Sequence, residues 1–129
     1  MINLFQELFF KSIIVFDKFI YLLFKKNFIY NFATFLNKEL FTKKIVSNKN
    51  LILYTPSKLV KWRTDTMLTK EPGTLKWIDS FSQYTSKPIF WDIGANIGLY
   101  SIYAAINNLN AKVISFEPSP TNVGILTKN

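Results

Sequence analysis

Five residues in the last third of the sequence have the types and spacing of a nucleoside-binding site. Gly94, Asn96 and Gly98 form a short turn between an apolar run and a helical pattern, and glycine lets a ligand approach the backbone without meeting a Cβ atom. Asp92 lies in the apolar run, and Glu117 follows a second apolar run. A carboxylate at that second position can accept hydrogen bonds from both hydroxyls of a ribose. These residues predict a site for an adenosine-containing ligand with an anionic group near the helix start.

The middle position of the turn separates two classes of ligand. Dinucleotide sites carry a glycine there, because the pyrophosphate passes close to the backbone. Here that residue is Asn96, and the last glycine of the pattern comes one residue early. Asn tolerates the left-handed backbone region, but its Cβ atom stands where a pyrophosphate would pass. S-adenosylmethionine has no phosphate and suits this turn better, while a nicotinamide-dependent oxidoreductase remains an alternative.

The elements that must position these residues form a βαβ unit. Residues 89–93 predict a strand buried on both faces, residues 99–107 a helix and residues 112–116 a second, parallel strand. Ser119 and Pro120 then predict the N-cap and first position of another helix. In open α/β sheets ligands bind beyond the carboxyl ends of the strands, which is where both carboxylates lie.

The preceding residues predict a mixture of short elements. Residues 42–50 are polar and are expected to form a turn or linker, and residues 51–54 a short strand. Residues 59–69 have mixed periodicity and receive no assignment.

A helix is predicted to begin near Pro72 and to run to Tyr84, because proline is well tolerated in a first helical turn. Thr69 or Lys70 is expected at its cap, with Leu75 and other apolar residues facing the core. The side chains expected in the core or in packing contacts are Ile78, Phe81, Trp62, Trp77, Trp91, Tyr100 and Tyr103.

Residues 2–26 predict a helix with apolar side chains over most of its surface. Its polar residues fall on one stripe, made of Asn3, Gln6, Glu7, Lys11, Asp17, Lys18 and Lys25. A membrane-spanning helix would need about 20 nearly uncharged residues, and a secretory signal would need a basic start and a cleavage site of small residues. We expect the rest of the protein or a second subunit to bury this helix. The alternative is peripheral contact with a membrane. A second helix is expected at residues 28–40.

Charge and composition exclude several classes of function. The net charge of the 129 residues is +8, yet residues 89–129 contain two Lys and two acidic residues. The excess therefore lies in residues 1–88, and it is Lys rather than Arg, which makes a sequence-specific nucleic-acid site unexpected. The chain has no Cys and no His, so disulfides and the commonest metal ligands are missing. No metal site is predicted, and no general base can be named.

Two runs of the sequence carry a resemblance to a known family. The segments FWDIGANIGLYSIYAA and VISFEPSP resemble those of the FkbM-type methyltransferases, a class I family that uses S-adenosyl-L-methionine. The preceding TDTMLTKEPGTLKWIDSF is similar to the segment before the first strand in that family. The resemblance implies O-methylation of a sugar or secondary-metabolite hydroxyl, with a small molecule or glycan as acceptor.

The resemblance also assigns roles to individual residues. It implies that Asp92, Gly94, Asn96 and Gly98 line the methionine end of the cofactor and that Glu117 binds the ribose hydroxyls. A sixth residue, Glu71, is expected to approach the same pocket.

The expected organisation is an N-terminal helical segment, residues 1–50, before the N-terminal part of a methyltransferase domain, residues 51–129. The expected fold class is α/β, a truncated Rossmann-like class I methyltransferase fold that contains the first βαβ unit. A complete domain of this class has seven strands. The 129 residues alone are therefore expected to be inactive and to bind cofactor weakly. A cytoplasmic protein is expected, and a non-catalytic, membrane-associated remnant stays open as a further alternative.

Overall fold

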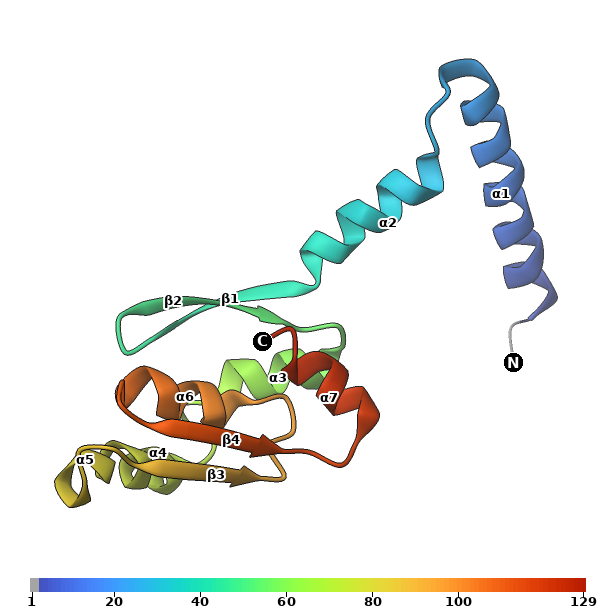
Figure 1. Ribbon diagram of the computed structural model, residues 1–129. Coiled ribbons are helices and arrows are strands. Elements are labelled where there is room, and N and C mark those ends of the chain that lie inside the picture. Colours follow the sequence, from blue (N-terminus) through green and yellow to red (C-terminus); the bar gives the residue numbers. More distant parts are fainter. Residues whose placement is uncertain (1–2) are drawn as a thin grey trace. The chain divides into compact units, whose positions relative to one another are not determined.

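The computed structural model describes residues 3–129 and shows a mixed α/β chain in two compact units (Figure 1). Unit 1 comprises residues 1–39 and unit 2 comprises residues 40–129. The division therefore falls before residues 42–50, which were expected to close the N-terminal segment. These residues belong to unit 2 because they take part in a β-hairpin.

Unit 1 consists of two helices, α1 (Leu4–Phe24) and α2 (Phe28–Glu39). Asn3 caps α1 and forms a capping box with Gln6, in which each side chain accepts a hydrogen bond from the other residue's backbone N–H. Both predicted helices are confirmed, although the expected start of the first, at residue 2, lies outside the described residues.

Within unit 1 the first helix is not buried, so its expected burial by the rest of the protein or by a second subunit stays a prediction. None of the residues of α1 is buried, and only Ile13, Asp17 and Ile20 are even half-buried. The apolar side chains exceed what the short contact with α2 can cover. Among residues 3–129, no helix is both long enough and apolar enough to cross a membrane.

Unit 2 begins with an antiparallel hairpin of β1 (Phe41–Val46) and β2 (Lys49–Tyr54). The turn predicted within residues 42–50 is confirmed at Ser47 and Asn48, but the residues on either side of it form strands and not a linker. The strand predicted at 51–54 begins two residues earlier. Val46 pairs with Lys49 across a two-residue loop. The loop residues Ser47 and Asn48 have φ values of 48° and 61°, as a type I′ turn requires.

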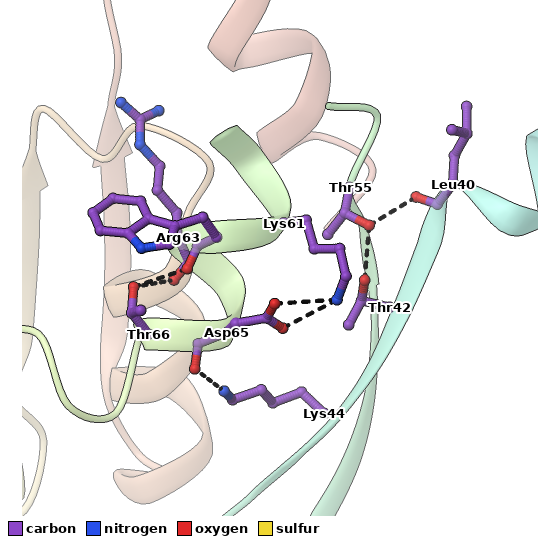
Figure 2. A network of polar contacts seen from close by, with 9 residues as sticks. Leu40, Thr42, Lys44, Thr55, Lys61, Arg63, Asp65 and Thr66 are labelled. Carbon is purple, nitrogen blue, oxygen red and sulfur yellow. Dashed lines mark hydrogen bonds and ion pairs between the residues drawn. The ribbon is translucent and has the colours of Figure 1, made fainter. Parts of the chain in front are cut away.

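Helix α3 (Lys58–Thr66) occupies the stretch that received no assignment, and Ser57 caps it. Figure 2 shows how α3 is attached to the hairpin: the Lys44 ammonium donates to the backbone carbonyl of Asp65 at 2.6 Å. Lys61 forms an ion pair with the Asp65 carboxylate along the helix. Arg63 lies on the side of α3 away from the hairpin (Figure 2).

The helix predicted from Pro72 to Tyr84 is two shorter helices, α4 (Pro72–Asp79) and α5 (Phe81–Tyr84). The N-cap is Glu71 rather than Thr69 or Lys70, and its side chain does not accept a capping hydrogen bond.

The predicted βαβ unit is confirmed: β3 (Ile89–Ile93) pairs in parallel with β4 (Lys112–Phe116), and α6 (Leu99–Asn107) connects them. Helix α7 (Pro120–Leu126) follows with Ser119 as its N-cap. Figure 1 shows α6 running alongside the two strands.

The prediction that β3 is buried on both faces is wrong. Phe90 and Asp92 face α6, whereas Ile89, Trp91 and Ile93 are 67%, 59% and 78% exposed. No element of unit 2, all of which the structure describes, covers that outer face. The expectation that the three tryptophans are core residues is also wrong. Trp91 lies on the uncovered face of β3, and Trp62 and Trp77 are exposed as well.

The core of unit 2 joins the hairpin to the βαβ unit. Its buried members are Val46, Leu53, Met67, Leu75, Ile78, Phe90, Tyr103 and Ala104. Asn108 is buried beside this core, and its side-chain amide donates to the backbone carbonyls of Ile78 and Ala104. These hydrogen bonds fix the C-terminal end of α6 against α4.

Candidate functional site

The loop between β3 and α6 alternates between left-handed and ordinary backbone. Gly94, Asn96 and Gly98 have φ values of 78°, 53° and 82°. Asn96 adopts the left-handed region as predicted, at the modest cost that Asn pays there. A Cβ atom built on Gly94 would have open space around it, with no other heavy atom within 4 Å.

Most backbone N–H groups of this loop already have partners within the protein. The N–H groups of Gly94 and Ala95 both donate to the Phe116 carbonyl, at 2.8 and 3.0 Å. Asn96 donates to Glu117 and Gly98 donates to the Ala95 carbonyl. The loop is thus closed onto the end of β4, and these amides cannot also surround an anionic group.

Glu117 fastens the loop and the start of α7 together. Its Oε2 accepts the Asn96 N–H at 2.7 Å, and its Oε1 accepts the Ser119 N–H at 2.8 Å and the Asn122 side-chain amide at 3.3 Å. These hydrogen bonds, chiefly that from Ser119, hold the pKa of the Glu117 carboxyl below its ordinary value. Sequence reasoning missed this structural role, which no short motif would have indicated.

Asp92 is held by Ser101, which in turn contacts Ser115. The Ser101 hydroxyl donates to Asp92 Oδ2 at 2.6 Å and lies 2.6 Å from the Ser115 hydroxyl. These residues come from β3, α6 and β4, so the arrangement depends on the parallel pairing. The other carboxylate oxygen, Oδ1, does not take part in this contact and can accept a hydrogen bond from a further partner.

A pocket of about 220 Å³ opens beside the loop. Gly94 and Asn96 line it together with Glu71, Arg63 and Tyr100. Three of the six predicted site residues therefore share one pocket, Glu71 among them. Asp92, Gly98 and Glu117 support the loop but do not line this pocket.

Gly98 lies close to helix α7. A Cβ atom on it would lie 3.2 Å from Cγ of Leu126 in α7. The absence of a side chain at Gly98 therefore serves the packing of α7 on the loop.

Two residues of the pocket were missed as site residues. Arg63 donates from its guanidinium to Asn96 Oδ1 at 2.8 Å and so holds the middle of the loop. Tyr100, which was expected only to pack, lies beside Glu71. Burial and a hydrogen bond to Glu71 raise the pKa of Tyr100 from 10.0 to about 12. Arg63 lies in residues 59–69, which received no assignment from the sequence. The one signal that could have indicated it as a site residue is that it is the single arginine of the chain.

Removing the charge of Glu71 should lower the pKa of Tyr100. In Glu71→Gln the pKa should fall from about 12 toward 10.0 but stay above it, because burial is the larger cause of the shift. Absorbance at alkaline pH would follow tyrosinate formation, with Tyr100→Phe assigning the signal. An unchanged titration in Glu71→Gln would show that the two side chains do not interact.

Comparison with known proteins gives one partial similarity. Over 44 residues, 34% of this chain, the sequence is 43% identical to a protein of Sordaria araneosa named methyltransferase sdnD, and the match covers 17% of that protein's length. No family model matches the chain, and no solved structure matches it.

Proposed function

We propose that unit 2 binds S-adenosylmethionine at the pocket beside Gly94 and Asn96, and that the protein is a class I methyltransferase of the FkbM type. The partial similarity to a methyltransferase supports the reaction class. The geometry of the loop supports the choice of cofactor, and the sequence resemblance supports a hydroxyl group of a sugar or secondary metabolite as acceptor.

One observation carries the proposal: the loop amides are already occupied. In a dinucleotide site the pyrophosphate passes close to the backbone of the glycine-rich turn itself, where free N–H groups hold it together with the helix start. Here the N–H groups of Gly94, Ala95 and Asn96 donate to the end of β4 and to Glu117. A cofactor without phosphate needs none of them, which favours S-adenosylmethionine over a nicotinamide dinucleotide.

The pocket fits part of such a ligand. Its volume of about 220 Å³ is below the roughly 300–1,000 Å³ usual for complete small-molecule sites, so it accommodates one end of the cofactor. The open space beside Gly94 lets that end approach the backbone. Glu71 and Arg63 supply opposite charges at the wall.

The remaining acceptor capacity of Glu117 suits one ribose hydroxyl. A carboxylate can accept about four hydrogen bonds, and three are taken by Asn96, Ser119 and Asn122. Oε2 accepts a single bond and therefore has room for a second.

The cofactor would supply an activated methyl group, and the residues of the chain align the reactants. Tyr100 does not serve as a general base near neutral pH, because its pKa of about 12 keeps the hydroxyl protonated. It is a hydrogen-bond donor in the pocket wall.

Nuclear magnetic resonance can test the proposal even when binding is weak. The chain contains only four glycines, so their amide signals are readily followed in a titration with S-adenosylmethionine. We expect the Gly94 signal to move and the signal of Gly124, in α7, to stay. A larger response to NAD than to S-adenosylmethionine would favour the oxidoreductase alternative, and no response to either would favour a non-catalytic remnant.

Glu117→Gln should weaken the affinity for S-adenosylmethionine by about ten- to a hundredfold, the scale of a lost hydrogen bond to a charged group. S-adenosylhomocysteine should lose as much, because it has the same ribose. The matched control is Asn122→Ala, which removes one contact to Oε1 and leaves Oε2 unchanged. If only one of the two ligands lost affinity in the titration, the ribose role would be wrong.

A further inference from the structure

Unit 1 has too few internal contacts to cover its own apolar side chains. The Ile29 N–H donates to Asp17 Oδ1 at 2.8 Å and fixes the start of α2 against α1. The Phe16 and Phe28 rings meet edge to face at 5.6 Å. Beyond this short seam the side chains are exposed: Phe5 is 77% and Leu22 is 68% exposed.

The space between the two helices is also apolar. A groove of about 470 Å³ is lined by Ser12 and seven apolar side chains, among them Phe10, Phe16 and Phe32. Exposed apolar surface on this scale marks a site of contact with a protein or a membrane.

The charges of α1 distinguish between these partners. Lys11, Lys18 and the capping residue Lys25 fall within roughly 40° on a helical wheel, and Glu7 on the same side is neutralised by an ion pair with Lys11 at 2.7 Å. The net charge of the stripe is positive, as is that of the whole chain. The side chains of Phe5 and Phe9 project from the opposite side of the helix.

A lipid surface matches this distribution better than a second copy of the chain. A helix in the membrane interface buries a broad apolar face among acyl chains while its lysines reach the headgroups. A second copy packed on the Phe5 and Phe9 side would leave the lysine stripes on the outside without an anionic partner, and the shared seam would still leave much of the broad apolar surface uncovered. The helix cannot span the bilayer, so it would lie along it.

We propose that unit 1 lies in the surface of an anionic lipid bilayer, with the Phe5 and Phe9 side of α1 in the acyl region and its lysines at the headgroups. This inference is independent of methyl transfer and would hold if unit 2 bound another ligand. The bilayer would bind the exposed helices both by the hydrophobic effect and by attraction between the lysines and the anionic headgroups.

Vesicle flotation of the 129-residue chain tests the proposal. The chain should float with vesicles of equal parts phosphatidylcholine and phosphatidylglycerol and bind far less to phosphatidylcholine alone. Added salt should weaken binding because it screens the charges. Equal binding to both kinds of vesicle would overturn the charge argument.

Substitutions separate the apolar contribution from the charged one. Phe9→Asp should weaken binding by about tenfold or more, the scale of burying one large apolar side chain. Lys18→Gln and Lys25→Gln should each weaken it by about fivefold. The matched control is Leu109→Asp, which places the same charge at an 80% exposed leucine of unit 2 and should bind as the parent does.

Two further measurements keep the result interpretable. All three tryptophans lie in unit 2, so unchanged emission shows that a unit 1 variant has left unit 2 folded. Sedimentation velocity without lipid reports self-association. A dimer that Phe9→Asp dissociates, combined with no flotation, would show that a second copy covers this surface and would overturn the proposal.

Discussion

Gly94→Val should abolish the response of the protein to S-adenosylmethionine while leaving most of unit 2 folded. The valine side chain would occupy the open space beside the loop, where no protein atom beyond the adjacent residues lies within 4 Å of a Cβ position. It would also strain the backbone, because φ is 78° there, at a cost of about 1–3 kcal/mol. The amide signals of Asn96 and Gly98 in the ligand titration are the readout.

Two matched variants separate the steric effect from the strain. Gly94→Asn adds a side chain of a residue that tolerates the left-handed region, so it should keep the loop and still lose the ligand. Gly124→Val places the same new side chain in α7, also in open space but without a positive φ, and should leave binding intact. Unchanged affinity in Gly94→Val would show that the glycine serves only the turn.

Ile78→Ala should be the most damaging single truncation in the core. Ile78 is 0% exposed, its backbone carbonyl accepts the Asn108 amide, and its side chain fills the space between α4 and the rest of the core. Truncating a buried isoleucine to alanine costs about 2–5 kcal/mol, a large part of the stability of a small domain. Urea denaturation followed by tryptophan emission would measure it.

The comparison for this prediction is Ile45→Ala in β1. Ile45 is 66% exposed, and truncating it should cost less than about 1 kcal/mol. Equal losses in the two variants would mean that the core is not centred on Ile78.

The βαβ unit could be predicted to the residue because its signals agree. Two short apolar runs are bounded by Gly94 and by polar turns, and Ser119 with Pro120 marks the next helix. The left-handed backbone of Asn96 followed from its position in the turn. All of these are local properties of a few neighbouring residues.

The features that escaped prediction either have weak local signals or depend on contacts distant in sequence. The hairpin turn at Ser47 and Asn48 has no glycine, so the strongest short-range hairpin signal is missing. Trp91 is exposed because no element of unit 2 packs on the outer face of β3. The apolar run of residues alone does not indicate whether that face is covered. Arg63 reaches Asn96 across 33 positions of sequence, which no periodicity reports.

The tight turn of the hairpin also sets an order of events during folding. Hairpins with a favourable two-residue loop form in about 1–10 μs, since little chain entropy is lost on closing so short a loop. Pairing of β3 with β4 must wait for the crossover through α6 to be ordered, and such nonlocal contacts form more slowly. We therefore expect the β1–β2 hairpin to be an early template, and the strand ends that carry Asp92 and Glu117 to meet last.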